Sequence, residues 1–230
     1  MRRLTKNTGL TGLLAMTCLI AAQASAAPAP TLFRLTVAGS AHQDWAYTAA
    51  PAQLGECSRK EMSEGIRNAK FATRRPIVVR LAGGHVLPVD VSGINGVVIL
   101  GGANTTEEQC GATGTAKIAD CAQTTRSFAG ARVRISSPRA GVVALTPIRN
   151  VRLRRAGCPS EPVDVTRRPL GPVPGPLNLP KAALMERNVA SITLSGSRTQ
   201  RKTYALPEAG RLEERAEWTL TFVRVKSSAR

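Results

Sequence analysis

The chain has 230 residues, of which 32 are Lys or Arg and 15 are Asp or Glu, so its formal charge at pH 7 is +17. A field of this size attracts anionic partners, although the arginines are scattered along the chain rather than clustered. Only 3% of the residues are aromatic, and this argues against nucleic-acid recognition by base stacking, which needs aromatic side chains as platforms.

Residues 1–26 have the organisation of a secretory signal peptide. Arg2, Arg3 and Lys6 precede an apolar run from about Leu10 to Ala22, and an A-x-A site follows at residues 24–26. We therefore expect a mature chain of residues 27–230 with a formal charge of +14, since three positive charges leave with the signal. The apolar run of the signal is too short for a membrane span, and no later run is long enough. The sequence thus predicts a secreted or extracytoplasmic protein, in the periplasm, the cell wall or the medium, without a transmembrane segment in the mature chain.

The mature chain begins with a pattern typical of a half-buried strand. In TLFRLTVAGS the apolar Phe33, Leu35 and Val37 alternate with polar residues, and a second strand is expected around Trp45 and Tyr47.

The next segment, SRKEMSEGIRNAKFATRRP, has two interpretations. Ser58 and Glu61 have the spacing of a helix capping box, whereas Arg67, Ala69 and Phe71 alternate as in a strand. The sequence leaves this segment open between helix and strand.

From residue 77 onward the chain consists of short β-branched runs bounded by Gly, Pro, Asn or Ser: IVVRL, VLPVDV, VVIL, ARVRIS, VVAL and VRLRR. Residues 159–180 form a Pro-rich loop or linker, since residues 158–180 hold seven of the fifteen prolines and proline removes backbone donors. After this segment, NVASITLSGSRTQRKTYAL and RAEWTLTFVRV predict a closing hairpin that returns to pair with the first sheet.

These patterns predict an all-β fold, an antiparallel sandwich or barrel-like domain over residues 27–230. The alternative is a small right-handed parallel β-helix, because GINGVVILGG and IRNVRLRRAG resemble single rungs of that fold.

Four cysteines remain after loss of the signal, an even number in an exported chain, and this favours disulfides over thiol chemistry. The loop CGATGTAKIADC is rich in small, turn-forming residues, so we expect Cys110 to pair with Cys121 and Cys57 with Cys158. No C-x-x-C motif is present, and His42 and His85 are isolated, so neither a redox site nor a structural zinc site nor any other cofactor is predicted.

The sequence contains no recognisable catalytic motif, and we assign no catalytic residue. His42 and Asp44 would share one face of a strand, but no nucleophile elbow accompanies them. Carboxylates are few, and a glycosidase needs two that face each other across a cleft. A carbohydrate-active or other hydrolytic enzyme on a β-scaffold is kept as the alternative function.

The main hypothesis is a non-enzymatic, exported binding or structural domain of the cell envelope or medium. In RVRI and VRLRR the arginines alternate with apolar residues, so Arg132 and Arg134 would share one face, as would Arg152 and Arg154. These four residues are the candidate contacts to an anionic envelope polymer or to another protein; the oligomeric state stays open.

The layout as a whole resembles that of uncharacterised secreted bacterial β-rich proteins with two disulfides. The resemblance rests on the opening FRLTVAGS strand, a first cysteine before the segment that runs into FATRRP, the C…DC loop and the closing EWTLTFVRV strand. It implies the β-rich fold class and no particular activity or catalytic residues.

Overall fold

The computed structural model describes residues 30–149, 169–180 and 189–226, apart from the side chains of residues 120–122 and 149. These residues form eleven β-strands and no helix. The strands are β1 Thr31–Thr48, β2 Ala52–Leu54, β3 Cys57–Thr73, β4 Ile77–Ala82, β5 His85–Val86, β6 Val89–Cys110, β7 Thr113–Ser136, β8 Val142–Arg149, β9 Leu177–Asn178, β10 Ser191–Tyr204 and β11 Ala209–Arg224.

The strands are arranged in the order β10-β11-β1-β3-β6-β7-β8-β9, with β2 beside β3 and β4 beside β1 and β5. The neighbouring strands pair antiparallel. This confirms the predicted all-β antiparallel fold, which is consistent with a sandwich and is not closed into a barrel. It is inconsistent with the alternative β-helix, in which strands pair in parallel. The predicted closing hairpin is β10–β11, and β11 pairs with β1 as expected.

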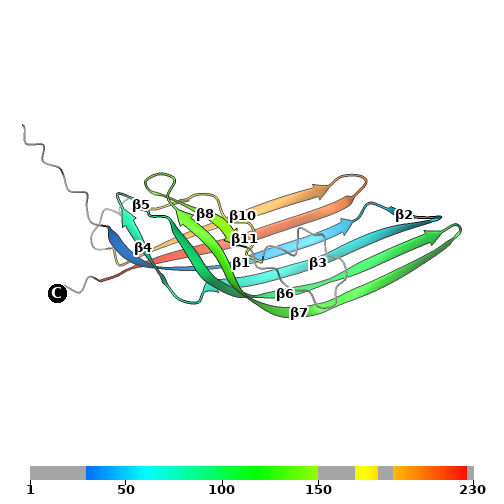
Figure 1. The fold of residues 1–230 in the computed structure, drawn as a ribbon, viewed down its shortest axis with the longest axis horizontal. Coiled ribbons are helices and arrows are strands. Elements are labelled where there is room, and N and C mark those ends of the chain that lie inside the picture. The colour runs from blue at the N-terminus through cyan, green and yellow to red at the C-terminus, as the bar shows by residue number, and fades with distance from the viewer. Residues whose placement is uncertain (1–29, 150–168, 181–188, 227–230) are drawn as a thin grey trace, which may run out of the picture.

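Six strands, β1, β3, β6, β7, β10 and β11, run along most of the long axis of the molecule (Figure 1). We call one end the arm. It consists of residues 41–69, 98–126 and 198–216, which form the tips of the β1–β3, β6–β7 and β10–β11 pairs. The other described residues form the body, where β4, β5, β8 and β9 add to the long strands (Figure 1).

The body contains the main hydrophobic core. On β1 the side chains of Phe33, Leu35 and Val37 are buried on one face, which we call the inner face. The same cluster takes in Val143 from β8 and Leu177 from β9, so the sheet curls and packs on itself at this end. The described part of the Pro-rich segment, residues 169–180, contributes further buried side chains to this core: Leu170, Leu177 and Leu179.

The arm has a much smaller apolar cluster, in which Trp45 and Leu212 pack with the partly buried Leu100 and Tyr204. The Trp45 ring lies over Gly65, its partner on β3, and a Cβ atom there would come within 2.5 Å of the ring. The ring of Trp45 therefore occupies the space that a side chain at Gly65 would need, and the two residues pack without a void.

The long strands join runs that the sequence pattern separates. Trp45 and Tyr47 lie on the same strand as Phe33, because β1 continues through Gly39 and Ser40. Phe71 covers Gly39 from the next strand in the same way that Trp45 covers Gly65, so this glycine is a packing position rather than a strand end. The segment with two interpretations is strand β3, and its Ala69 and Phe71 belong to the core.

Candidate functional site

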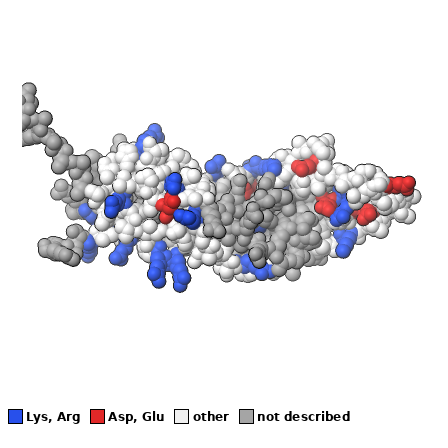
Figure 2. All heavy atoms as spheres, in the orientation of Figure 1, with Lys and Arg blue, Asp and Glu red and all other residues white. Residues whose placement is uncertain are grey.

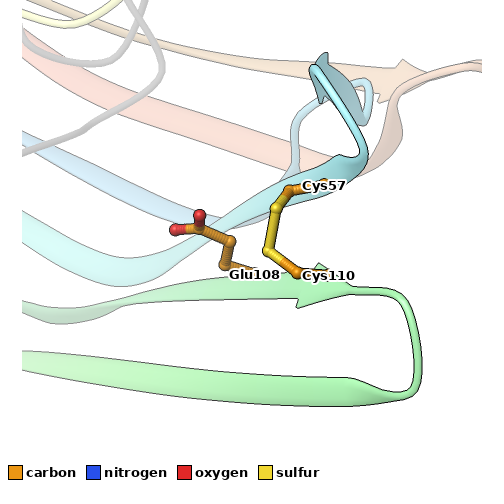
Figure 3. A group of neighbouring side chains, drawn as sticks. All are labelled: Cys57, Glu108 and Cys110. Carbon is orange, nitrogen blue, oxygen red and sulfur yellow. A yellow bond between two sulfur atoms is a disulfide. The ribbon is translucent and has the colours of Figure 1, made fainter.

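The cysteine pairing differs from the prediction. Cys57 is bonded to Cys110, and the two residues are direct partners on β3 and β6 with their Cα atoms 4.1 Å apart (Figure 3). The expected pairing of Cys110 with Cys121 is wrong because CGATGTAKIADC is a hairpin rather than a free loop. Its turn consists of Gly111 and Ala112 alone, and Cys121 lies eight residues beyond Thr113 on β7, roughly 26 Å from the tip at the usual rise of a strand. The expected bond of Cys57 to Cys158 is also wrong, because the sulfur of Cys57 is bonded to that of Cys110.

A second disulfide remains a prediction. The backbone of Cys121 pairs with Gly102, while its side chain and the whole of Cys158 lie outside the described residues. With Cys57 and Cys110 joined, only Cys121 and Cys158 are left to pair in the chain after residue 26.

The disulfide also decides between a clamp and a metal site. The ligand atoms of Cys57, Cys110 and Glu108 lie within 4.8 Å of one another (Figure 3), a grouping that could hold a metal ion if the sulfurs were thiolates. In the bonded state both sulfurs are used in the bridge. The pair therefore acts as a clamp between β3 and β6 at the tip of the arm.

The histidines are not arranged for catalysis among the described residues. His42 and Asp44 do lie on one face of β1, but the His42 ring bonds to Asn68, with 2.7 Å between Nδ1 and Oδ1. The Asp44 carboxylate faces Arg211 at 3.7 Å. His85 lies on the two-residue strand β5. The described groups thus give no support to a Ser-His-Asp site.

A cavity of about 380 Å³ lies at the tip of the arm beside β3, β6 and β7. Its lining includes Lys60, Glu107 and Glu108, and Lys60 and Glu107 are direct partners on β3 and β6. Glu108 follows Glu107 on the same strand, and successive strand residues point to opposite faces. The two carboxylates therefore do not face each other across this cavity as a glycosidase pair would.

The inner face of the arm carries a row of buried polar side chains that the sequence reasoning missed. Glu214, Gln43 and Arg67 are neighbours on β11, β1 and β3 and are at most 6% exposed. The Gln43 amide Nε2 donates a hydrogen bond to Glu214 Oε1. Beside this row the Trp45 indole Nε1 donates to Ser63 Oγ at 3.1 Å. The only signal in the sequence was positional, since Gln43 occupies an inward place between Ala41 and Trp45.

Two of the four predicted binding residues lie together as expected. Arg132 and Arg134 share the outward face of β7, between the buried Ala131, Val133 and Ile135. Arg134 donates two hydrogen bonds to Asp90 from one edge of its guanidinium, Nε to Oδ1 at 2.7 Å and Nη2 to Oδ2 at 3.2 Å, and Arg132 lies 3.8 Å from the same carboxylate.

The ion pairs of Arg134 and Arg132 with Asp90 affect the charge of this surface. The hydrogen bond from Arg134, aided by the charges of both arginines, lowers the pKa of Asp90 below its ordinary value. Asp90 thus stays ionised and neutralises part of the predicted binding surface. The other two candidates, Arg152 and Arg154, lie outside the described residues.

Charge is divided unequally between the two regions. By sequence, the described body has eleven Lys or Arg residues and two Asp or Glu residues, whereas the arm has ten of each. Figure 2 shows most of the visible acidic side chains toward the tip of the arm, and basic side chains spread along the body. The net positive charge of the described chain is therefore a property of the body.

No family model matches this chain, and neither a curated protein nor a solved structure matches it. Among the described residues, no helix has the length and apolar character needed to cross a membrane.

Proposed function

We propose that the protein is an exported, non-enzymatic binding protein whose body holds an anionic component of the cell envelope, while the arm extends away from the contact. The main observation in support of this proposal is the division of charge: the described body has eleven basic and two acidic residues, whereas the arm has ten of each. The signal-like residues 1–26 and the disulfide are compatible with an extracytoplasmic site of action.

The physical basis is the field of the body. Charges of one sign gathered on one region raise the local concentration of an oppositely charged polymer, an effect that salt weakens. An arm with balanced charge contributes little to this field. The polymer should therefore contact the body before the arm, whichever segment of the polymer approaches the protein.

The test measures binding of the purified, oxidised protein to soluble anionic polymers, namely teichoic acid and DNA, at low and physiological salt. Replacing Arg74 and Arg75 of the body by Gln should weaken binding severalfold. The matched control replaces Lys117 and Arg126 of the arm by Gln, which removes the same charge and should change binding little. Equal losses from both double variants, or binding that disappears for every polymer at physiological salt, would refute the proposal.

A single substitution should strengthen binding. Asp90→Asn removes the carboxylate that holds Arg134 and Arg132, so both guanidinium groups become available and the body gains one positive charge. We expect a severalfold higher affinity at low salt, measured with the same polymers. An unchanged affinity would show that Arg132 and Arg134 are not part of the binding surface.

A further inference from the structure

Four of the exposed aliphatic side chains lie together on the outer face of the body. Leu32 on β1, Val78 on β4, Leu87 just after β5 and Val223 on β11 are 39%, 58%, 41% and 46% exposed. Together with two arginines on β1 and β4 they form a group that we call the apolar–basic patch: Leu32, Arg34, Val78, Arg80, Leu87 and Val223.

The strand register places these residues side by side. Leu32 pairs with Arg80, and the backbone N–H of Leu87 donates to the Arg80 carbonyl at 2.9 Å, so these three form one row across the sheet. Arg34 pairs with Val78 on one side and with Val223 on the other, which makes the next row. Each arginine thus has an aliphatic residue as its neighbour on both adjacent strands or segments.

The two arginines differ from several arginines of the arm in their partners. Arg201 is bonded to Glu213 at 2.8 Å, and Arg211 faces Asp44 at 3.7 Å. Arg34 and Arg80 have no ion-pair partner among the residues that the structure describes. The patch therefore combines uncompensated positive charge with apolar surface that remains in contact with water.

We propose that the apolar–basic patch binds the surface of an anionic lipid bilayer. This inference rests on the proposed function and narrows its ligand from anionic polymers in general to an anionic amphiphile. The arginine side chains can lay their methylene stems along apolar surface and direct their charged ends to lipid phosphates, while the aliphatic groups enter the boundary between headgroups and acyl chains.

A lipid surface fits the patch better than a protein partner does. Protein interfaces are enriched in Tyr, Trp, Phe and Met at their centres, and the patch has none of these residues. It also has no acidic side chain. An exposed aliphatic surface rimmed by positive charge is complementary to a flat surface that presents phosphates above hydrocarbon.

The test uses the oxidised protein and sedimentation with two kinds of vesicle, phosphatidylglycerol mixed with phosphatidylcholine, and phosphatidylcholine alone. The protein should bind only the anionic vesicles. Since a basic residue near an anionic membrane contributes about 1 kcal/mol, Arg34→Gln and Arg80→Gln should each lower the partition coefficient about fivefold, and together about 30-fold. Val78→Thr with Leu87→Thr should remove the part of the binding that survives high salt; threonine keeps the exposed position 78 of β4 favourable for a strand.

The control again replaces Lys117 and Arg126 of the arm by Gln, and circular dichroism confirms that each variant is folded. Equal binding to both vesicles, or equal loss from the patch and arm variants, would overturn the inference. So would a dimer in sedimentation analysis that Val78→Thr dissociates, since the patch would then bind a second copy. If the unmodified protein binds soluble polymers and does not bind anionic vesicles, the lipid assignment is overturned and the proposed function stands. If it binds neither, the proposed function is overturned as well.

Discussion

The body and the arm share six long strands, yet they differ in what the inner face of the sheet carries. In the body the inward positions of β1 are Phe33, Leu35 and Val37, and they join one large apolar core. A few residues further along the same strand, the inward positions are Gln43 and Trp45, and the apolar cluster there is small. Alternation is constant along β1, so it is the choice of inward side chain that decides where the core is built. The body should accordingly supply most of the stability, and the arm should depend on local devices.

The largest expected effect comes from the body core. Phe222 is fully buried and packs edge-on against Phe33, with ring centroids 6.5 Å apart. Phe222→Ala should lower the free energy of unfolding by about 3–5 kcal/mol, measured by urea denaturation. Tyr204→Ala in the arm cluster is the comparison and should have a clearly smaller effect. An equal loss from both variants would show that stability is not concentrated in the body.

The disulfide should matter next, and mainly in the arm. It joins residues 53 apart in sequence, and removal by Cys57→Ala with Cys110→Ala should reduce stability by about 2–4 kcal/mol. Hydrogen exchange should become faster at the start of β3 and the end of β6, because these strand ends lose their clamp, while the exchange of β8 and of the body half of β1 should change less. Uniformly faster exchange in both regions would contradict a local role.

A smaller effect is expected where the arm strands approach closely. Gly65→Ala would place a methyl group 2.5 Å from both the Trp45 ring and the Gly101 carbonyl oxygen, and such overpacking costs about 1–3 kcal/mol. Gly114→Ala is the matched control, since its nearest contact would be at 3.9 Å. If both substitutions gave the same unfolding midpoint, Trp45 would not be packed against Gly65.

The smallest effect concerns pH. Burial, followed by the hydrogen bond to Glu208, raises the pKa of Tyr47 from 10.0 to about 12. Because the folded pKa lies above the unfolded value, the stabilisation is complete below pH 10 and is lost as the pH rises from 10 to about 12. An ultraviolet titration of phenolate formation, with Tyr47→Phe for assignment, should show this late-titrating group. A Tyr47 that titrates near 10 would mean that the tip is open to water.

The sequence predicted the features that depend on neighbouring residues. The alternation of Phe33, Leu35 and Val37 identified the start of β1, and the alternation around Arg132 and Arg134 placed both arginines on one face. The lengths of the strands were not predictable in this way, because Gly39 looks like a strand end until the ring that covers it is known.

Features that depend on residues far apart in sequence could not be found from local patterns. The pairing of Cys57 with Cys110 requires that β3 and β6 are neighbours in register, which no spacing of cysteines reveals. The ion pair of Arg134 with Asp90 could not be predicted either, because the two residues are 44 apart in sequence and meet only through the pairing of β6 with β7. The apolar–basic patch was partly within reach, since Leu32 and Arg34 are outward positions of the first predicted strand, but its other members come from β4 and β11.

The two ends of the described sheet lie side by side in the body, where Phe33 at the start of β1 pairs with Arg224 at the end of β11. Neighbouring termini are the condition under which circular permutation is tolerated. A short linker could join these ends, and the chain could be reopened at the Gly111–Ala112 turn at the tip of the arm without separating any strand pair. A permuted chain that folds would show that the order in which the strands are synthesised does not determine this architecture, and its new termini would place a fused reporter at the end of the molecule opposite the basic body.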